Sequence, residues 1–388
     1  MAIENKIVIT CSPRITPILT KEVKSLGYKI LESDRLSVTV YGSFNDTMYL
    51  NLHLRTANKV LYHLKSFKAE NPEELYKELN SMNWERYIRS DGYICINGYV
   101  KNDKIKDTRF ANLKAKDAIV DRIQKLKGRR PDSGPDQTKS MVYLYWKDKD
   151  ASIYIDTSGE TISKHGYRKV PFKAPMAESL AAACIMESKW DKKSAFINPM
   201  CGSGTLAIEA ALLAINKAPG LMRSNFGFMH VNQYNEFEWN KMVKEAESKI
   251  SIPKNLRIQA SDLSNLALKA ARNNAEFAGV ESLISFELSD FRKIDLPKEN
   301  GVIMMNPEYG LRLGELTELE KTYAEIGDFF KTKGKGYTGY VFTGNLDLAK
   351  RIGLKTSRRI ELFNAKLDAR LLEYELYEGS KKNSKLPI

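Results

Sequence analysis

The stretch 196–211 constrains the fold of this chain more than any other part of it. It reads Phe-Ile-Asn-Pro-Met-Cys-Gly-Ser-Gly-Thr-Leu-Ala-Ile-Glu-Ala-Ala. Residues 194–197 predict a short strand, and residues 205–215 carry apolar side chains at helical spacing. Between them, Gly202 and Gly204 permit a tight turn with positive φ and leave bare backbone for a ligand. The helix N-terminus adds unpaired N–H groups and partial positive charge. Taken alone, such a turn is equally consistent with a plain strand–helix connection.

A second strand end would lie beside this turn. Residues 256–260 predict a strand that ends in Ser261 and Asp262, and residues 266–278 predict a helix behind it. A carboxylate at the end of the second strand of such a unit accepts hydrogen bonds from ribose hydroxyls. Asp262 is therefore a candidate ligand for a nucleoside.

A third strand end carries a ring and an amide. The apolar run 301–305 predicts a buried strand, and the loop after it holds Asn306, Pro307, Glu308, Tyr309 and Gly310. Strand and helix patterns alternate from 171 to about 378, which is typical of an α/β doubly wound parallel sheet. Ligands bind at the carboxyl edge of such a sheet, so we expect the three strand ends to line one site.

Together these motifs resemble the class I S-adenosylmethionine-dependent methyltransferases. They are most similar to the THUMP-domain RNA guanine-N2 methyltransferases, on the residues 198–205, 261–262 and 306–309. The stretches 163–168 and 173–181 are similar to the lead-in that this family carries before its first motif. The resemblance covers nearly the whole chain. It implies S-adenosyl-L-methionine as cofactor and RNA, either 23S rRNA or tRNA, as partner.

The resemblance also implies how the cofactor is held. The first turn would face the methionine and ribose, and Asp262 would bind the ribose hydroxyls. Asp290, after the strand predicted at 284–288, would accept from the adenine amine, and Leu263 and Phe291 would sandwich the adenine. For each aspartate the alternative is a helix cap or a turn former. The full implied set is Asn198, Pro199, Cys201, Gly202, Gly204, Thr205, Asp262, Leu263, Asp290 and Phe291.

The motif Asn306-Pro307-x-Tyr309 suits methylation of an exocyclic amine, whose lone pair is delocalised into the base. The side-chain oxygen of Asn306 and the carbonyl of Pro307 would accept both N–H bonds and aim the lone pair at the methyl group. Tyr309 would stack on the base, which must leave its own stack to reach the pocket. Cys201 lies in the cofactor turn, so chemistry through a cysteine adduct is disfavoured.

Two residues depart from the family pattern. The family usually has proline where this chain has Glu308, whose carboxylate would point to solvent, take a proton or reshape substrate choice. The family's usual acid is Asn198 here, which keeps hydrogen bonding but not charge. The first departure leaves open a non-catalytic RNA-binding assembly factor with a degenerate motif. Adenine-N6 methylation of DNA fits the motif as well, but the RNA-type N-terminal half argues against it.

The N-terminal half predicts two modules. Residues 1–70 have a β-α-β-β-α-β-like order that suggests a ferredoxin-like domain. Residues 71–162 resemble the THUMP fold, with a helix over 112–127 that stops at Gly128. Residues 163–378 would form the methyltransferase domain, and 379–388 a disordered tail. The aromatic-rich stretch 220–238 is either a mobile flap over the site or a surface insertion.

Positive charge is concentrated in one stretch of the chain. The net charge is +13, and residues 101–130 hold eleven Lys or Arg against four Asp. Such density favours contacts to phosphate, which position a nucleic acid without reading its sequence; the alternative is a solvated helix face. We predict RNA contacts from Lys106, Arg109, Lys114 and Lys116, and from Lys164 and Arg168 in the lead-in to the catalytic domain.

Other features exclude several classes of site. The cysteines at 11, 95, 184 and 201 are far apart, which indicates reduced thiols in the cytoplasm. The four histidines show no metal-ligand spacing, so we expect no metal, and His165 is either a catalytic base or, more in keeping with a loop, a structural or RNA-contacting residue. No apolar run is long enough to span a membrane, and no signal peptide is expected. Nothing in the sequence indicates the oligomeric state.

Overall fold

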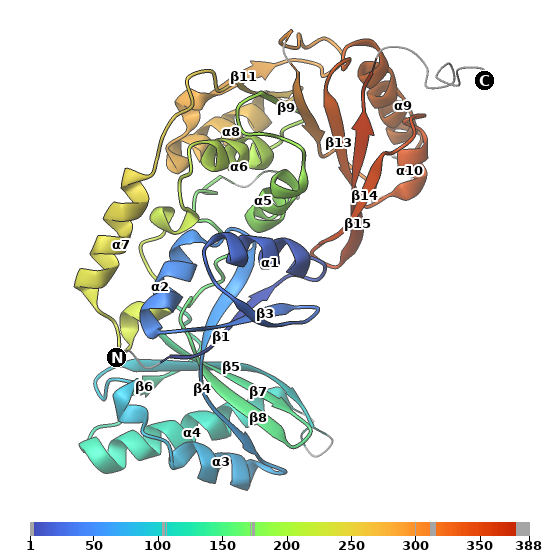
Figure 1. Ribbon diagram of the computed structural model, residues 1–388. Helices are drawn as coiled ribbons and strands as arrows, with labels where there is room; N and C mark the ends of the chain where they lie inside the picture. The colour runs from blue at the N-terminus through green and yellow to red at the C-terminus, as the bar shows by residue number, and fades with distance from the viewer. Residues whose placement is uncertain are drawn as a thin grey trace, which may run out of the picture. The chain divides into compact units, whose positions relative to one another are not determined.

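The structure is a computed structural model that describes residues 4–102, 105, 107–170, 172, 175–298, 300–310 and 316–377 (Figure 1). The predicted disordered tail lies outside these residues. The chain forms two compact units, one of Met1–Lys164 with Ala218–Ser248, and one of His165–Lys217 with Lys249–Ile388. Segment 218–248 lies in the C-terminal half of the sequence but belongs to the N-terminal unit of the structure.

The N-terminal unit is built on one eight-stranded sheet. Its elements are β1 (Asn5–Cys11), α1 (Thr16–Ser25), β2 (Ile30–Ser33), β3 (Ser37–Gly42), α2 (Phe44–His53), β4 (Ala57–Lys68), α3 (Pro72–Asn80), η1 (Trp84–Arg86), β5 (Tyr93–Lys101), α4 (Thr108–Lys127), β6 (Asp132–Ser133), β7 (Ser140–Lys147) and β8 (Asp150–Asp156). The strand order is β2-β3-β1-β4-β8-β7-β5-β6.

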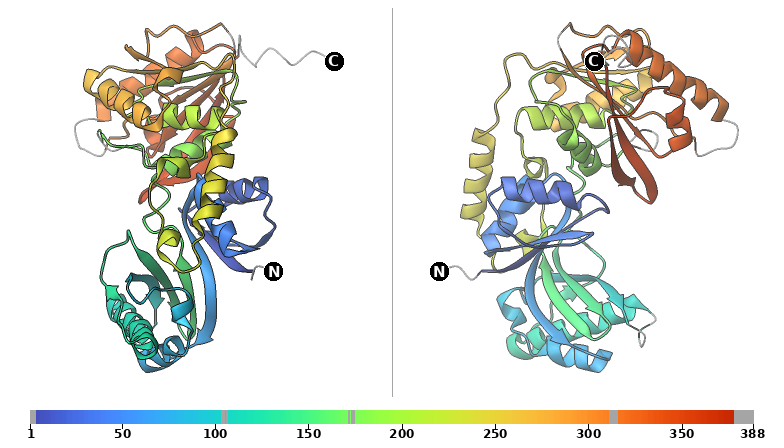
Figure 2. Two further views of the ribbon diagram at one scale, coloured as in Figure 1. Left: turned by 90° about the vertical axis from the view of Figure 1, so that its left-hand side faces the viewer. Right: turned by 45° about the vertical axis from the view of Figure 1, so that its right-hand side comes forward.

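Strand β4 joins the two predicted N-terminal modules. It pairs antiparallel with β1 on one side and with β8 on the other, and it is the long blue strand of Figure 2. The modules predicted at 1–70 and 71–162 therefore share a continuous sheet, which the sequence pattern did not reveal. The predicted β-α-β-β-α-β order of residues 1–70 is confirmed, with β2 as a mostly exposed edge strand.

Local signals set the helix ends of this unit. Ser43 and Asp46 form a capping box at the start of α2. Asp107 caps α4, and Gly128 ends it with φ of 71°, which confirms the predicted stop. Helix α4 buries Ala111, Ala115, Ile119 and Ile123 along its inner side, whereas Arg109, Lys125 and Lys127 are exposed.

The C-terminal unit is the predicted doubly wound α/β structure. Its elements are α5 (Glu178–Glu187), β9 (Ala195–Pro199), α6 (Thr205–Ala214), β10 (Ile258–Asp262), α8 (Asn265–Ala278), η4 (Glu281–Leu283), β11 (Ile284–Leu288), β12 (Gly301–Met305), α9 (Leu316–Thr332), β13 (Thr338–Thr343), α10 (Leu346–Lys350), β14 (Arg358–Asn364) and β15 (Leu367–Glu375). The order β11-β10-β9-β12-β13-β15-β14 is parallel through β13 and ends in an antiparallel hairpin of β14 and β15.

The segment 218–248 forms η2 (Pro219–Met222), η3 (Gly227–His230) and α7 (Glu236–Ser248). Phe226 and Phe228 stack at 5.0 Å, and Trp239 packs against both rings. Phe228 N–H donates to the carbonyl of Thr157, next to the end of β8. This packing gives Phe226, Phe228 and Trp239 a structural role within the N-terminal unit, whereas Phe237 is exposed.

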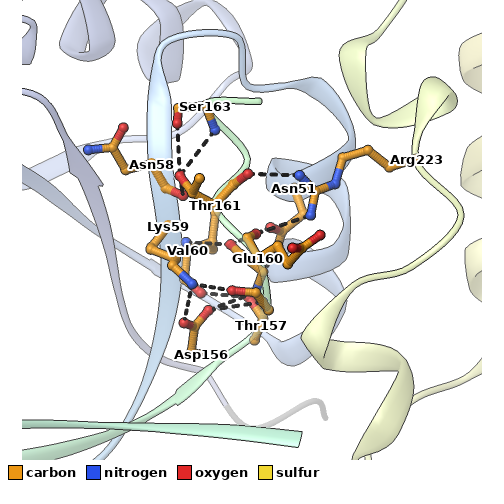
Figure 3. A network of polar contacts seen from close by, with 12 residues as sticks. Asn51, Asn58, Lys59, Val60, Asp156, Thr157, Glu160, Thr161, Ser163 and Arg223 are labelled. Carbon is orange, nitrogen blue, oxygen red and sulfur yellow. Dashed lines mark hydrogen bonds and ion pairs between the residues drawn. The ribbon is translucent and has the colours of Figure 1, made fainter. Parts of the chain in front are cut away.

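A polar network fastens the residues that follow β8 (Figure 3). The buried carboxylate of Asp156 pairs with Lys59 at 2.8 Å, and Lys59 also donates to the carbonyl of Gly159. The guanidinium of Arg223 donates to the carbonyls of Glu160, Thr161 and Lys164. Segment 218–248 therefore holds the backbone of 160–164, immediately before the second unit begins.

We expect Gly204→Ala to destabilise the protein more than Gly202→Ala. Both glycines have positive φ, which costs an alanine about 1–2 kcal/mol. A Cβ at Gly204 would also lie 2.9 Å from the Cβ of Ala271, whereas a Cβ at Gly202 meets nothing within 4 Å. Urea unfolding of both variants measures the difference, which we expect to be about 1–3 kcal/mol. Equal losses would contradict the close packing of the turn on α8.

Candidate active site

The candidate site lies where the order of the parallel strands reverses. The chain runs outward from β9 through β10 to β11 on one side, and from β12 to β13 on the other. Loops at the carboxyl ends of β9 and β12 therefore diverge and leave a crevice, the position at which such sheets bind ligands. The three predicted motifs follow β9, β10 and β12, so the fold brings them to this one edge.

The first turn leaves β9 at Pro199 and enters α6 at Thr205. Met200, Gly202 and Gly204 all have positive φ. The close approach to Ala271 explains why position 204 is glycine, whereas the backbone of Gly202 is open and can face a ligand. The thiol of Cys201 is buried, and burial raises its pKa, so it stays protonated.

Asn198 bridges the two central strands. Its Nδ2 donates to the carbonyl of Met304 at 2.8 Å, just beyond Ile197 and Ile303, the last register pair of β9 and β12. The side chain is buried, and its Oδ1 has no hydrogen-bond partner among the described residues. An unpaired buried acceptor beside the first turn is costly unless a ligand donor satisfies it.

Asp262 is aimed at the first turn. Its Oδ2 accepts from the N–H of Gly202 at 2.9 Å, and its Oδ1 accepts from the N–H of Ser264 at 2.9 Å. The carboxylate thus ties the end of β10 to the glycine turn and also starts α8. The next side chain, Leu263, is 70% exposed and free to cover a ligand.

Asp290 and Phe291 are engaged within the protein. Arg292 donates from Nε to both Asp290 oxygens at 2.9 Å, and this pairing lowers the pKa of the carboxyl. Phe291 is buried and packs edge-on against Phe329 at 5.8 Å. The predicted adenine contacts of these two residues stay predictions, and both have structural roles as well.

The loop after β12 brings Asn306 and Tyr309 together. The Tyr309 hydroxyl donates to Asn306 Oδ1 at 3.1 Å and accepts from Asn364 Nδ2 at 3.3 Å. Burial raises the pKa of Tyr309, so the phenol keeps its proton well above neutral pH. Pro307 is buried, whereas the side chain of Glu308 is exposed to solvent.

Sequence reasoning missed the residues that support this loop. Asn345, the N-cap of α10, donates to the carbonyl of Tyr309 at 3.2 Å. Tyr323 of α9 donates to the carbonyl of Glu308 at 3.3 Å. An asparagine after a strand and before a helix was a usable signal for Asn345. Asn364 and Tyr323 had no such signal, because only the folded sheet brings them to the loop.

Arg168 is held inside the C-terminal unit. Its guanidinium pairs with the buried Glu178 at 3.4 Å and donates to Thr205 Oγ1 at 2.9 Å and to the carbonyl of Met176 at 2.5 Å. The predicted RNA contact needs an available guanidinium, so these partners favour a structural role. His165 is likewise buried, with Nδ1 2.7 Å from Glu209 Oε1, which favours the structural interpretation over a catalytic base.

The other predicted RNA contacts lie in the N-terminal unit. Arg109 is highly exposed, at the start of α4, and pairs with Asp107. Lys114 and Lys116 are half-buried on the same helix, and Lys164 is exposed. Lys106 lies outside the described residues. In the part of the chain that is described, no cluster of His, Cys, Asp or Glu could hold a metal ion, and no helix is long and apolar enough to cross a membrane.

Family models match three stretches of the chain. The model described as the RMKL-like methyltransferase domain matches residues 165–373. The chain belongs to this family. A model of the RlmL ferredoxin-like domain matches residues 6–61, and a THUMP model matches residues 69–156. These matches confirm the predicted ferredoxin-like, THUMP and methyltransferase folds.

Several RMKL-like relatives are similar over nearly the whole chain. The identity to Ribosomal RNA large subunit methyltransferase K/L is 33% for the Syntrophotalea carbinolica protein and 34% for that of Psychromonas ingrahamii, over 96% and 93% of this chain. The chain covers 54% and 49% of those two proteins, about half of their length. It is also 30% identical to a Synechocystis protein provisionally named an RNA methyltransferase, over 95% of this chain and 96% of that one.

Solved structures of similar proteins share the fold. A possible methylase from Clostridium difficile 630 matches with a TM-score of 0.88 and 29% identity, over 98% of this chain and all of that one. SMU.472, a provisionally assigned methyltransferase complexed with SAH, matches with a TM-score of 0.87 and 27% identity, over 98% of this chain and all of that one. The C-terminal unit therefore has the class I methyltransferase fold.

We expect Arg168→Gln to lower stability and to leave RNA affinity unchanged. Removing the guanidinium strands the buried carboxylate of Glu178, at a cost of about 3 kcal/mol in the free energy of unfolding. Lys164→Gln gives the opposite expectation, because that exposed side chain can contact RNA without supporting the fold. Urea unfolding and RNA binding of both variants test this. A stable Arg168→Gln protein that binds RNA weakly would restore the predicted RNA contact.

Proposed function

We propose that the chain is an S-adenosylmethionine-dependent RNA methyltransferase that methylates the exocyclic N2 of a guanosine, in 23S rRNA. The observation that carries the proposal is the Asn306–Tyr309 loop at the switch point, beside an open glycine turn. The names of the relatives that span most of this chain support RNA, and large-subunit rRNA in particular, as substrate.

The residues of the first turn fit the cofactor. The open backbone at Gly202 leaves room for a ligand, and the unpaired Asn198 Oδ1 offers an acceptor to a donor such as an ammonium group. Asp262 would accept from ribose hydroxyls, with Leu263 over the adenine. The rest of the proposed cofactor set is Pro199, Cys201, Gly204, Thr205, Asp290 and Phe291. When bound, S-adenosylmethionine supplies an electrophilic methyl group.

The loop after β12 would orient the nucleophile. Asn306 Oδ1 and the carbonyl of Pro307 would accept the two N–H bonds of the guanine amine and direct its lone pair away from the ring. Tyr309 would stack on the base after its hydroxyl releases Asn306, which then becomes free to accept from the substrate. Positioning of this kind is a large part of the rate that an enzyme can gain without covalent catalysis.

Two side chains limit the alternatives. The buried, protonated Cys201 thiol is a poor nucleophile, which argues against attack on a pyrimidine ring. Glu308 points to solvent, and its backbone carbonyl is held by Tyr323, so the missing proline is compensated in part by this hydrogen bond. This support for the loop favours an active enzyme over a non-catalytic RNA-binding assembly factor.

We also propose a division of labour along the chain. Residues 1–70 would form a ferredoxin-like scaffold, residues 71–162 would bind RNA, and residues 163–378 would carry out methyl transfer. The protein would act in the cytoplasm, where the four buried cysteines remain reduced thiols. Arg109, Lys114, Lys116, Lys164 and Lys106 would contact phosphates. The same reaction on tRNA is the alternative substrate, and a methylation assay on both RNA pools separates the two.

We expect Asn306→Ala to slow methyl transfer strongly and to leave cofactor affinity intact. Loss of one positioned acceptor should lower the rate by about 10²–10³-fold. Asn300→Ala, at the other end of β12, is the matched control. The assay uses labelled S-adenosylmethionine with rRNA and tRNA from a strain that lacks this gene, followed by digestion to nucleosides, and binding of S-adenosylhomocysteine is measured separately.

Label in N2-methylguanosine from the large-subunit rRNA would support the proposal, and label only in tRNA would select the alternative substrate. No product in either pool, with cofactor still bound, would favour the non-catalytic interpretation. Full activity of Asn306→Ala would contradict the assignment of the active site.

We expect reversal of three charges on α4 to weaken RNA binding and flatten its salt dependence. Removal of one phosphate contact lowers the slope of log K against log salt by about 0.7–0.9. The variant combines Arg109→Glu, Lys114→Glu and Lys116→Glu. Reversal of Lys241, Lys244 and Lys249 changes the net charge equally and is the control. Equal effects of the two triple variants would show that α4 is merely a solvated surface.

A further inference from the structure

The α-helices of the N-terminal unit cover one face of its continuous sheet. On the opposite face, η3 packs against β7 and β8 beside the buried Met141 and Asp156, whereas Tyr99 and Tyr145, farther along the strands, remain exposed. Phe44 of α2 packs edge-on against Tyr62 of β4 at 5.5 Å, so Tyr62 lies on the covered face. Tyr62 is in register with Ile155, and Ile155 with Val142, and all three are buried. The covered face thus runs on through β8 and β7, toward helices α3 and α4 (Figure 1). The neighbours of these residues along each strand, such as His63, Tyr154 and Tyr143, point to the opposite face.

A band of rings crosses this open face. Tyr99 of β5 stacks on Tyr145 of β7, with ring centres 5.5 Å apart and planes within 19°. The ring centres of Tyr143 and Tyr154 of β8 are 6.4 Å apart, and those of Tyr154 and His63 of β4 are 5.3 Å apart. The rings therefore form an almost unbroken series over four neighbouring strands, β5, β7, β8 and β4.

Several of these rings are exposed to an unusual degree. Tyr99 is 45% and Tyr145 39% exposed, and Tyr41 of β3, farther along the same face, is 53% exposed. Aromatic side chains bury a large apolar area when they find a partner, so a face that keeps three of them open is a candidate binding surface. A core role does not explain them.

Positive charge borders the rings. Lys6 is in register with Tyr41, and Lys101 is in register with Lys147, directly beyond the Tyr99–Tyr145 pair. Lys101 and Lys147 are exposed. The acidic neighbours are neutralised, because Glu32 pairs with Lys6 at 3.1 Å and Asp150 pairs with Lys68. The surface therefore offers flat rings together with a surplus of lysine.

Polar groups between the rings could contact base edges. His63 Nε2 lies 2.8 Å from Ser66 Oγ, which lies 2.8 Å from Ser152 Oγ. Burial and the nearby Lys6 lower the pKa of His63, so the imidazole is neutral at pH 7 and retains an acceptor or a donor according to its tautomer. Hydroxyls at the ring tips have the same dual capacity.

We propose that this open face, defined by Tyr41, His63, Tyr99, Tyr143, Tyr145 and Tyr154, binds an unpaired segment of RNA. Bases stack on the rings, and phosphates lie near Lys101 and Lys147. The proposal rests on RNA being the partner under the proposed function and adds which kind of RNA segment is bound. Single strands fit because their bases expose flat faces, whereas the bases of a duplex are hidden. A protein partner would be expected to find aliphatic side chains and fewer lysines here.

The surface is distinct from the basic residues of α4, a helix that lies on the covered side of the sheet. Cations on a helix suit the phosphates of any RNA, paired or not. Rings on a sheet discriminate between unpaired and paired RNA, because they gain binding energy only from bases that are free to stack. The two surfaces thus predict different responses to paired and unpaired probes.

The test is fluorescence anisotropy of this chain with two labelled RNAs, a non-pairing 12-nucleotide strand and a 16-base-pair duplex. The double variant Tyr99→Ala, Tyr145→Ala should bind the strand about 30-fold more weakly and the duplex within twofold of wild type. The double variant to phenylalanine keeps the rings and should bind the strand normally. Phe237→Ala, which removes an exposed ring from α7, is the matched control.

Three results would overturn the proposal. The first is strand binding by the alanine double variant at wild-type affinity, and the second is an equal loss of affinity for strand and duplex in that variant. The third is no strand binding by the wild type, which would leave a protein as the partner of this surface. Circular dichroism spectra verify that the variants are folded. Because the binding assay needs no cofactor, an inactive protein that binds the strand through its rings would refute the proposed methyl transfer but support this surface. If the enzyme is active but the alanine double variant binds the strand like the wild type, methyl transfer would be supported and this surface refuted.

Discussion

The Asn198 amide is the interaction on which the candidate active site depends. The hydrogen-bond ladder between β9 and β12 ends at the pair Ile197 and Ile303, where the two strands begin to diverge. One residue farther, Asn198 Nδ2 spans the gap to the carbonyl of Met304. The glycine turn starts from one end of this bridge and the Asn306 loop from the other, so their spacing depends on it. An ionised carboxylate at position 198 would have no proton to donate to the carbonyl of Met304. This hydrogen bond therefore requires the amide of Asn198.

Polar side chains from distant elements hold the loop that follows Asn306. Asn345, Asn364 and Tyr323 come from α10, β14 and α9, and each bonds the loop or its tyrosine. Buried polar groups of this kind need partners, and the loop supplies carbonyls and a hydroxyl that would otherwise be unpaired. Support from the antiparallel strand β14 explains why the hairpin after β13 matters to a site built on parallel strands.

The N-terminal unit combines two different chemistries on one sheet. Its covered face carries helices, with exposed basic residues on α4, and its open face carries rings bordered by lysine. Strand β4 makes this possible, because its length lets two modules share one sheet and so aligns their open faces. The half-buried Arg223 then holds the backbone that leads out of the unit, and burial lowers the pKa of this guanidinium.

Local sequence determined the elements and much of the site. The strand–turn–helix of 195–214, the stop of α4 at Gly128 and the polar ends of β10 and β12 all follow from short-range sterics, periodicity and capping. Tertiary structure alone decided which partners those residues meet. Arg168 became a buried partner of Glu178, Asn364 reached Tyr309 from 55 positions away, and segment 218–248 joined the first unit. A sequence pattern reports the preferences of near neighbours, whereas these pairings are set by packing between elements that are far apart in the chain.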